Sequence, residues 1–192
     1  DLRLNAKLNI ASESITDGPL VLLVHGTLAH NDMEIIANLQ TLLEDESLNS
    51  LAINLSLGVD DRHGMYDCAV PHQHHHQDAM AEIALWIEWL KEQGVTQVLI
   101  AGHSRGGSQV AAYNQNPDPV VLGQVLVAPA TWSAQAMAES YHRRYQKHLS
   151  DLIKVAQQQP ADGWMPQPTD FIYCNQAPQV KAASFLSYYN PP

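Results

Sequence analysis

The residues of this sequence best suited to chemistry are the five at positions 102–106, Gly-His-Ser-Arg-Gly. They fit the pattern G-x-S-x-G, in which a serine hydroxyl stands on a sharp turn between a strand and a helix. An apolar run at 98–101 precedes the pattern, and residues 107–113 can begin a helix. So sharp a turn leaves little room for side chains two residues before and after the serine, which accounts for Gly102 and Gly106. We therefore predict that Ser104 is a catalytic nucleophile.

A second motif, His25-Gly26-Thr27, follows another apolar run. When a serine attacks an ester, the carbonyl oxygen becomes negatively charged, and two backbone N–H groups can stabilise it. The residue after the nucleophile, Arg105, is expected to supply one of these groups. We expect Thr27 to supply the other, with Leu28 as the alternative, because Gly26 lets this loop approach closely.

Histidines at positions 72, 74, 75 and 76 form a third candidate group. On a helix, His72 and His76 would share a face and could hold a metal, with Asp78 nearby. The alternatives are a polar segment that starts a helix after Pro71, or side chains that line a pocket. The paired Cys or Glu context of known zinc motifs is missing, so we predict no metal site.

Other polar residues near these motifs have simpler interpretations. We expect His30 and Asp32 to cap a helix that begins near Met33, although contact with a substrate is the alternative. The segment 60–64, Asp-Asp-Arg-His-Gly, is expected to form a polar loop with surface salt bridges. His103 is not expected to be the catalytic base, because side chains adjacent to the nucleophile point away from the attacked carbonyl.

The four tryptophans are expected to be packing residues. For two of them, Trp132 and Trp164, a position facing an acyl chain is the alternative. The other two are Trp86 and Trp89.

Periodicity places these motifs on alternating strands and helices. Residues 2–10 alternate apolar and polar, which predicts a half-buried antiparallel strand at a sheet edge. Continuous apolar runs predict strands covered on both faces at 20–24, 51–55, 98–101 and 121–128. Helical spacing follows at 33–43 and 79–90, the second ended by Gly94. Alternation of this kind favours a mainly parallel sheet flanked by helices.

The pattern changes after Pro129. Residues 134–159 predict one long helix or two, and residues 169–189 are weakly helical with two aromatic clusters. No convincing buried strand is predicted here. We therefore divide the chain into a core at 1–130 and a helical cap at 131–192.

Composition excludes several classes of function. The formal net charge of −10 argues against binding to nucleic acid or anionic membranes. No apolar run reaches the roughly 18 residues of a membrane span. The two cysteines, Cys68 and Cys174, are expected to be buried thiols, with a single disulfide as the alternative. The chain begins at Asp1 without a methionine, so we expect something to have been removed upstream, and a signal peptide, a disordered start or an artificial boundary would each fit. Export to the periplasm is slightly favoured over the cytoplasm.

At the quoted motifs the chain resembles the α/β-hydrolase superfamily, and particularly its bacterial members. The matching segments are 22–27, 98–107 and 125–129, so the resemblance covers residues 1 to about 130. It implies an α/β-hydrolase fold that cleaves a small-molecule ester or related acyl bond through Ser104, without a cofactor. The alternatives are an acyltransferase, or a non-catalytic protein on the same scaffold that binds a ligand or partner.

The chain departs from this family where the catalytic base should be. The expected order is nucleophile, acid and then a histidine, on loops after later strands. The histidines after Ser104 are His142 and His148, both on a predicted helix, and the aspartates that follow them are in the wrong order. We therefore expect the acid and base to lie outside this chain and the fold to be incomplete at its C-terminus.

Overall fold

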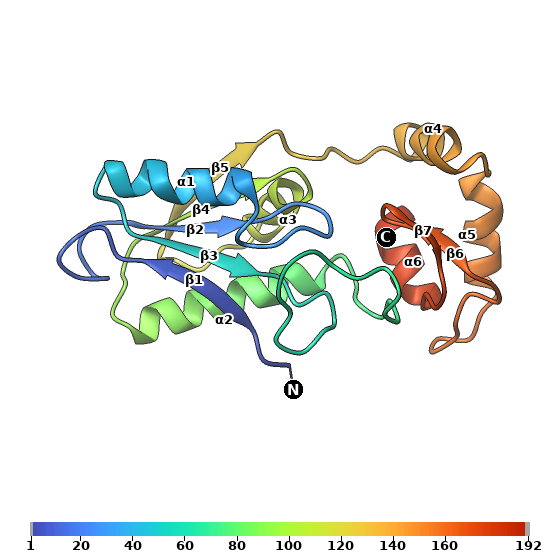
Figure 1. Cartoon of the computed structure of the whole chain (residues 1–192), viewed down its shortest axis with the longest axis horizontal. Coiled ribbons are helices and arrows are strands. Elements are labelled where there is room, and N and C mark those ends of the chain that lie inside the picture. Colours follow the sequence, from blue (N-terminus) through green and yellow to red (C-terminus); the bar gives the residue numbers. More distant parts are fainter. Residues whose placement is uncertain (1, 191–192) are drawn as a thin grey trace. The chain divides into compact units, whose positions relative to one another are not determined.

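The computed structural model of this protein describes residues 2–190 (Figure 1). They form two compact units. One comprises the chain up to Tyr66 together with Ala79–Ala130, and the other comprises Asp67–Asp78 together with the chain from Thr131 onward. The structure thus groups residues 67–78 with the later part of the chain, whereas the division by sequence places them in the core at 1–130.

A mainly parallel sheet forms the centre of the first unit (Figure 1). Its strands are β1 (Asn5–Asn9), β2 (Leu20–Val24), β3 (Ser50–Asn54), β4 (Val98–His103) and β5 (Val121–Val127). The spatial order is β1-β3-β2-β4-β5, with β1 antiparallel to β3 and the other pairs parallel. The predicted fold class and the antiparallel edge strand are confirmed.

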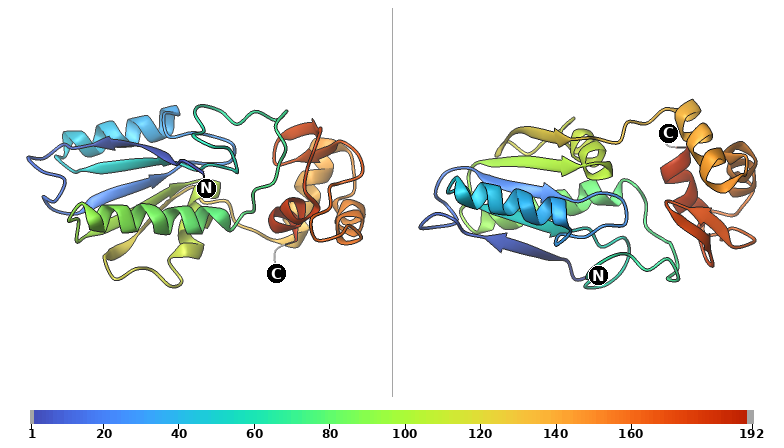
Figure 2. Two further views of the ribbon diagram at one scale, coloured as in Figure 1. Left: turned by 90° about the horizontal axis from the view of Figure 1, so that it is seen from below. Right: turned by 45° about the horizontal axis from the view of Figure 1, so that its top comes forward.

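Three helices cover the two faces of this sheet (Figure 2). They are α1 (Glu34–Asp45), α2 (Asp78–Glu92) and α3 (Arg105–Tyr113). Val21 and Leu23 of β2 pack with Ile36 of α1 on one face. On the other face, Leu22 packs in a cluster that includes Ile83 of α2 and, from α3, a buried valine. Because consecutive residues of β2 are buried on opposite faces, the strand reads as an unbroken apolar run.

Strand β5 differs from its prediction. It was expected to be covered on both faces, but Leu122 is 57% exposed and Val125 is 50% exposed. Within the described part of the chain, β5 is the last strand of the sheet and pairs only with β4. An apolar run predicts a strand, but the coverage of each face depends on neighbours that the run does not specify.

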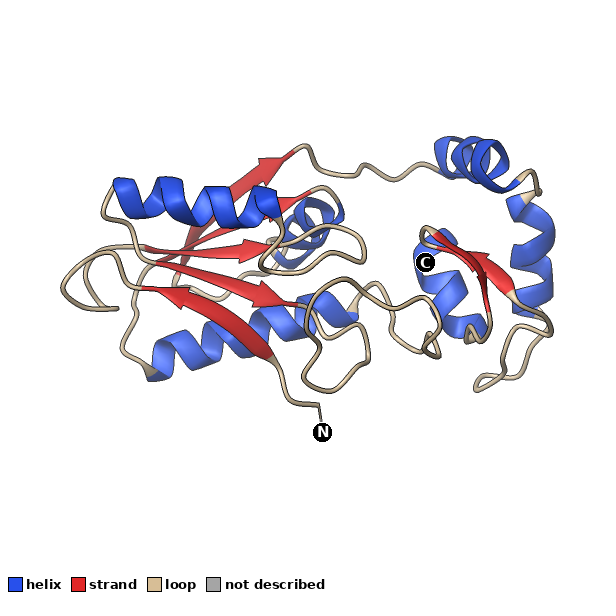
Figure 3. Cartoon of the chain, in the orientation of Figure 1, coloured by secondary structure: helices blue, strands red, loops and turns tan. Residues whose placement is uncertain are grey.

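The second unit combines helices with a small hairpin (Figure 3). Its elements are α4 (Ala134–Tyr145), α5 (Leu149–Gln157), β6 (Thr169–Phe171), β7 (Cys174–Ala177) and α6 (Ala182–Tyr189). Of the two alternatives for 134–159, two helices are present. The expectation that this region lacks a buried strand is wrong, because all three residues of β6 are buried. Phe171 packs edge-on against Tyr188, and this distant aromatic contact stabilises a strand too short to predict from periodicity.

A disulfide bond joins Cys68 to Cys174, so the expectation of two buried thiols is wrong. The bond joins the segment 67–78 to the rest of the second unit. Two backbone hydrogen bonds do the same, from His72 N to Gln179 O at 2.9 Å and from Lys181 N to His72 O at 2.9 Å. The two cysteines are 106 residues apart in sequence, so only the tertiary fold brings them together.

Replacing both cysteines with serine should lower the free energy of unfolding by about 2–4 kcal/mol, because the disulfide restricts the unfolded chain. Urea unfolding followed by circular dichroism measures the change. A thiol reductant should destabilise the wild-type protein to a similar extent and leave the double variant unaffected. Equal midpoints for wild-type and double variant would contradict a stabilising bond.

Among the helices within residues 2–190, none combines the length and the apolar character that crossing a membrane requires.

Candidate active site

Ser104 lies on the turn between β4 and α3, with φ 53° and ψ −120°. A non-glycine residue rarely adopts a positive φ, and such strain persists only where the surroundings hold it. Here the Ser104 N–H donates to Val127 O at 3.0 Å, while the Ser104 carbonyl accepts from Gly107 N at 3.0 Å and Ala130 N at 2.9 Å. The turn is therefore fixed from the neighbouring strand β5 as well as from its own helix.

The glycines around Ser104 fill positions that admit no side chain. A Cβ placed on Gly102 would lie 2.5 Å from the Gly106 carbonyl oxygen. A Cβ on Gly106 would lie 2.5 Å from the Val24 carbonyl oxygen, at the end of β2. The pattern G-x-S-x-G therefore reflects two close approaches, one within the turn and one between the turn and the next strand.

The loop after β2 lies directly against the serine turn. A Cβ on Gly26 would be 3.3 Å from the Ser104 Cβ. Arg105 Nε donates to Thr27 Oγ1 at 2.9 Å, which ties the loop to the start of α3. Within residues 2–190, the N–H groups of Thr27 and Leu28 make no hydrogen bond. The structure thus brings together the two segments from which the sequence predicts an oxyanion hole.

The amide of Arg105 belongs to the first turn of α3. Amides in the first turn of a helix point out of its N-terminus, where the helix dipole favours negative charge. A carbonyl oxygen that became negative beside Ser104 would meet this end of the helix. The arrangement is electrostatically suited to a developing oxyanion.

His25 is buried at the start of the loop and is held as one neutral tautomer. Its Nε2 accepts from Leu55 N at 3.1 Å and lies 3.1 Å from Arg62 Nη2, so the proton is on Nδ1, which donates to Gly26 O at 2.8 Å. Burial, together with the charge of Arg62, lowers the pKa of His25 to about 3. His25 therefore shapes the loop and does not exchange protons near neutral pH.

Burial of His25 should make the protein less stable in acid. The unfolded chain binds a proton at His25 near pH 6.5, whereas the folded chain does so only near pH 3. Between these values unfolding takes up a proton, so the free energy of unfolding falls with falling pH by up to about 1.4 kcal/mol per pH unit.

Urea unfolding of the wild-type protein and of His25→Gln at pH 7 and pH 4 measures this effect. Because both proteins share their carboxylates, the difference between their pH dependences reports on residue 25. The variant should lose less stability on acidification. Identical pH dependences would show that the folded protein protonates His25 readily.

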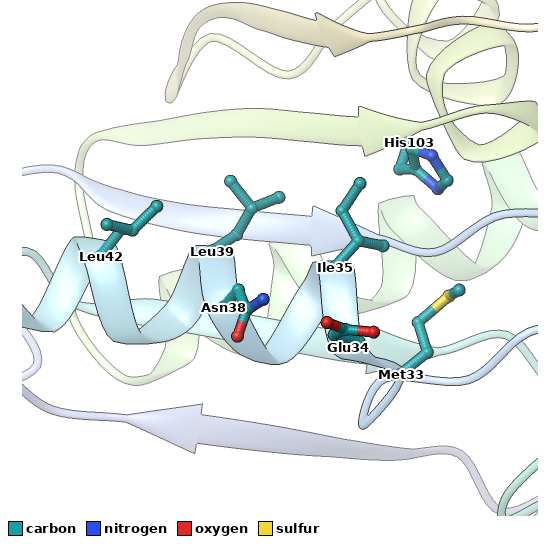
Figure 4. A pocket seen from close by; sticks show the side chains of 7 residues that line it. All are labelled: Met33, Glu34, Ile35, Asn38, Leu39, Leu42 and His103. Carbon is teal, nitrogen blue, oxygen red and sulfur yellow. The ribbon is translucent and has the colours of Figure 1, made fainter.

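His103, the residue before the nucleophile, contributes to a pocket of about 460 Å³ on the α1 side of the sheet (Figure 4). Its Nδ1 would lie 3.4 Å from a Cβ on Gly26. Figure 4 shows the aliphatic side chains of Ile35, Leu39 and Leu42 following one another along α1, with His103 at the end of β4. The other residues that line the pocket are Met33, Glu34 and Asn38.

No histidine in the described part of the first unit is hydrogen-bonded to Ser104. In the described chain, the Ser104 hydroxyl makes no hydrogen bond to a histidine. The later histidines, His142 and His148, lie on the second unit, where their exposed rings stack 5.0 Å apart. His142 lies in the last turn of α4, on a helix as predicted, whereas His148 is the residue before α5 and is not on a helix, so that part of the prediction is wrong.

The histidines at 72–76 do not lie on a helix, because α2 begins only at Asp78. The shared helical face of His72 and His76, and the helix start at Pro71, are therefore absent. His72 instead packs edge-on against Phe171, and His74 Nδ1 lies 2.9 Å from Tyr188 Oη. Within residues 2–190, no three potential ligand side chains are grouped to hold a metal ion. Burial lowers the pKa of His72, whose ring belongs to this aromatic core.

Two predictions about polar residues near the site are wrong. Asp32 does not cap α1, because the residue at the N-cap is Met33, and the Asp32 carboxylate accepts from Lys7 Nζ at 2.7 Å. Arg62 is not part of a surface salt bridge, because it is only 5% exposed. The expected surface pairing does occur at Asp60, which binds Arg3. Nothing in the local sequence marks Arg62 as buried, since the polar residues Asp61 and His63 flank it.

Two of the tryptophans pack as predicted. Trp86 and Trp89 contact each other and the core of the first unit. Trp164 lies under the ammonium group of Lys181, and Trp132 is 49% exposed.

Comparisons with known proteins agree with this geometry. The family model described as serine aminopeptidase, S33, matches residues 19–184. A comparison with curated proteins found no match. Est1E from Butyrivibrio proteoclasticus, solved with bound ferulic acid, is similar with a TM-score of 0.63 and 18% identity, over 97% of this chain and 66% of Est1E.

Two further solved structures are similar. The esterase PF2001 of Pyrococcus furiosus has a TM-score of 0.58 and 15% identity, over 75% of this chain and 52% of the esterase. The monoacylglycerol lipase of Paleococcus ferrophilus has a TM-score of 0.53 and 19% identity, over 99% of this chain and 70% of the lipase. Of the length of Est1E, this chain spans 66%, just under two-thirds.

At these identities the solved structures show a shared fold. The family model, which covers most of the chain, shows the family. This chain belongs to the serine aminopeptidase S33 family of α/β hydrolases.

Proposed function

We propose that the protein is a serine hydrolase that cleaves a carboxylic ester or related acyl bond, with Ser104 as its nucleophile. The observation that carries this proposal is the backbone of Ser104, held at φ 53° and ψ −120° between β4 and α3, beside the loop at Gly26. Strain of this kind is found where a functional side chain must be presented in one direction. The esterases and the lipase named above share this fold.

The proposed reaction has two stages. Ser104 Oγ attacks the acyl carbon and forms a tetrahedral intermediate, whose oxyanion accepts hydrogen bonds from the amides of Thr27 and Arg105. Departure of the alcohol leaves an acyl-enzyme, which water then hydrolyses. Each amide donor is expected to contribute a factor of about 10²–10³ to kcat.

The proton on Ser104 Oγ must pass to a base during the attack. His25 is committed to the loop by its hydrogen bonds and its low pKa, and it cannot fill this role. We therefore infer that the base is a histidine other than His25. His148 and His142, the two histidines that follow Ser104 in the sequence, are the first to replace in the search for it.

Labelling with a fluorophosphonate tests the proposal, because such probes react only with an activated serine. The adduct is located by peptide mass spectrometry, and hydrolysis of short-chain p-nitrophenyl esters is measured in parallel. Labelling at Ser104 that His148→Ala or His142→Ala abolishes would identify the replaced histidine as the base. Labelling seen only in a longer protein would assign it to the added segment. A folded protein that labels in neither form would contradict the proposal.

A further inference from the structure

Arg62 is an arginine in an exposed loop whose own side chain is buried. The residues on either side, Asp61 and His63, are partly or fully exposed, whereas Arg62 is 5% exposed. Removing a guanidinium group from water is costly unless its N–H groups find acceptors. Because its burial is costly, we expect the Arg62 side chain to hold the groups around it in fixed positions.

Acceptors from three segments surround the guanidinium group. It donates from Nε to Leu55 O at 2.7 Å, from Nη1 to Gly64 O at 2.6 Å, and from Nη2 to Asn54 Oδ1 at 2.8 Å. The amide of Asn54 donates back to the Arg62 carbonyl. The side chain is thereby fixed to the end of β3 and to its own loop.

The remaining contacts of Nη2 reach the loop after β2, which we assign to the oxyanion hole. Nη2 donates to Ala29 O at 2.8 Å and lies 3.1 Å from His25 Nε2. These two contacts hold both ends of the segment that contains Thr27 and Leu28. The segment needs such support because Leu28 has a φ of 54°.

Arg62 also reaches the imidazole of His25, whose tautomer is fixed by Leu55. The Leu55 N–H can only donate to Nε2, so the ring proton lies on Nδ1 and donates to Gly26 O at 2.8 Å, while Arg62 Nη2 lies 3.1 Å from Nε2. A chain of hydrogen bonds thus runs from the guanidinium through the imidazole to the backbone of Gly26. That backbone lies beside Ser104, since a Cβ on Gly26 would be 3.3 Å from the Ser104 Cβ.

The charge of Arg62 is balanced within the same unit. Glu82 of α2 is also buried, and its carboxylate accepts from Ser56 N at 2.9 Å and from Ser56 Oγ at 2.5 Å. Burial lowers the pKa of Arg62 to about 10, and the charge of Glu82 opposes this shift. The guanidinium is therefore protonated at neutral pH and donates all its hydrogen bonds.

We propose that Arg62 is a positioning residue that aims the amides of the loop at 26–28 toward the oxyanion formed at Ser104, acting through His25 and the Ala29 carbonyl. This inference rests on the proposed hydrolase function. Arg62 touches no reacting atom, and its effect is on the direction of backbone amides that do.

Removing the guanidinium in Arg62→Ala should therefore lower kcat by about 10²-fold, the effect of losing one oxyanion donor, with little change in KM. Lysine at this position has one point charge and cannot reproduce the fork of donors, so Arg62→Lys should recover only part of the loss. Methylguanidinium added to Arg62→Ala should restore part of kcat. The matched control is Arg3→Ala, because Arg3 is an exposed arginine that pairs with Asp60 in the same loop.

Kinetics are measured on protein shown to be folded by circular dichroism. If Arg62→Ala does not fold alone, Arg62→Lys and the guanidinium-rescued protein carry the test. A loss of kcat that methylguanidinium restores supports the proposal. A folded Arg62→Ala or Arg62→Lys with wild-type kcat, or a loss confined to KM, overturns it.

Hydrogen exchange separates this inference from the proposed function. Within the peptide covering residues 25–30, the Ala29 amide, which donates to Gly26 O at 3.3 Å, should exchange at least tenfold faster in Arg62→Ala, while a peptide from β4 should not change. Unchanged exchange at 25–30 overturns the positioning role whether or not the protein is a hydrolase. A wild-type protein that neither labels nor hydrolyses esters overturns the proposed function, and exchange alone then decides the role of Arg62.

Discussion

Ser104→Ala should abolish fluorophosphonate labelling and lower kcat for ester hydrolysis by roughly 10⁶-fold in the active protein. The hydroxyl group is the only part of the side chain removed, and the proposed reaction begins with the attack of its oxygen on the acyl carbon. Alanine keeps the Cβ and the backbone hydrogen bonds of the turn, so we expect the variant to fold. The free energy of unfolding from urea titration provides that check.

The matched control for this variant is Ser108→Ala. Ser108 lies one turn further along α3, and its hydroxyl donates to Arg105 O at 2.8 Å. Its removal deletes an equivalent atom from the same helix without touching the proposed nucleophile, so labelling and kcat should stay near those of the wild-type protein. Ester hydrolysis by Ser104→Ala at a rate close to that of Ser108→Ala would show that Ser104 is not the nucleophile.

Gly106→Ala should lower the free energy of unfolding by about 3 kcal/mol, the upper part of the range for overpacking a close contact. In an ordinary helix the same change would stabilise the protein by about 1 kcal/mol, because alanine has the higher helix propensity. The sign is reversed here because the new Cβ would meet the carbonyl oxygens of Val24 and His25. Movement of these carbonyls would also displace the loop at Gly26, so activity should fall with stability.

Gly123→Ala provides the comparison for this effect. Gly123 is in β5, where a Cβ would find only Leu99 Cδ2, at an ordinary 3.9 Å. The change should be neutral or slightly stabilising, since glycine in a strand costs conformational entropy. Urea unfolding of the two variants side by side measures the difference. Equal stabilities would contradict the close approach of β2 to the start of α3.

The core elements of the first unit are predictable because their signals are local. The alternation at residues 2–10 predicts β1, and the apolar run at 20–24 predicts β2. Helical spacing and Gly94, which has a φ of 87°, predict α2 and its end. The motif at 102–106 predicts a sharp turn because a strand followed at once by a helix requires small flanking residues.

The second unit is less predictable because its contacts join distant segments. The hairpin of β6 and β7 is short, and its burial depends on aromatic rings from α6. His72 and His74 are polar residues, yet they are buried among those rings. Their local pattern resembles the start of a helix, but hydrogen bonds to Gln179 and Tyr188, more than 100 positions away, hold them in place.

The sequence by itself determined the α/β order of elements, the turn at Ser104 and the glycines that this turn needs, because each follows from the residues within one turn or strand. Only the tertiary structure decided that Cys68 bonds Cys174 and that Arg62 is buried beside His25 and Ala29. The reason is physical. Burial and bond formation depend on which distant groups a side chain meets, and the residues next to it in the chain do not carry that information.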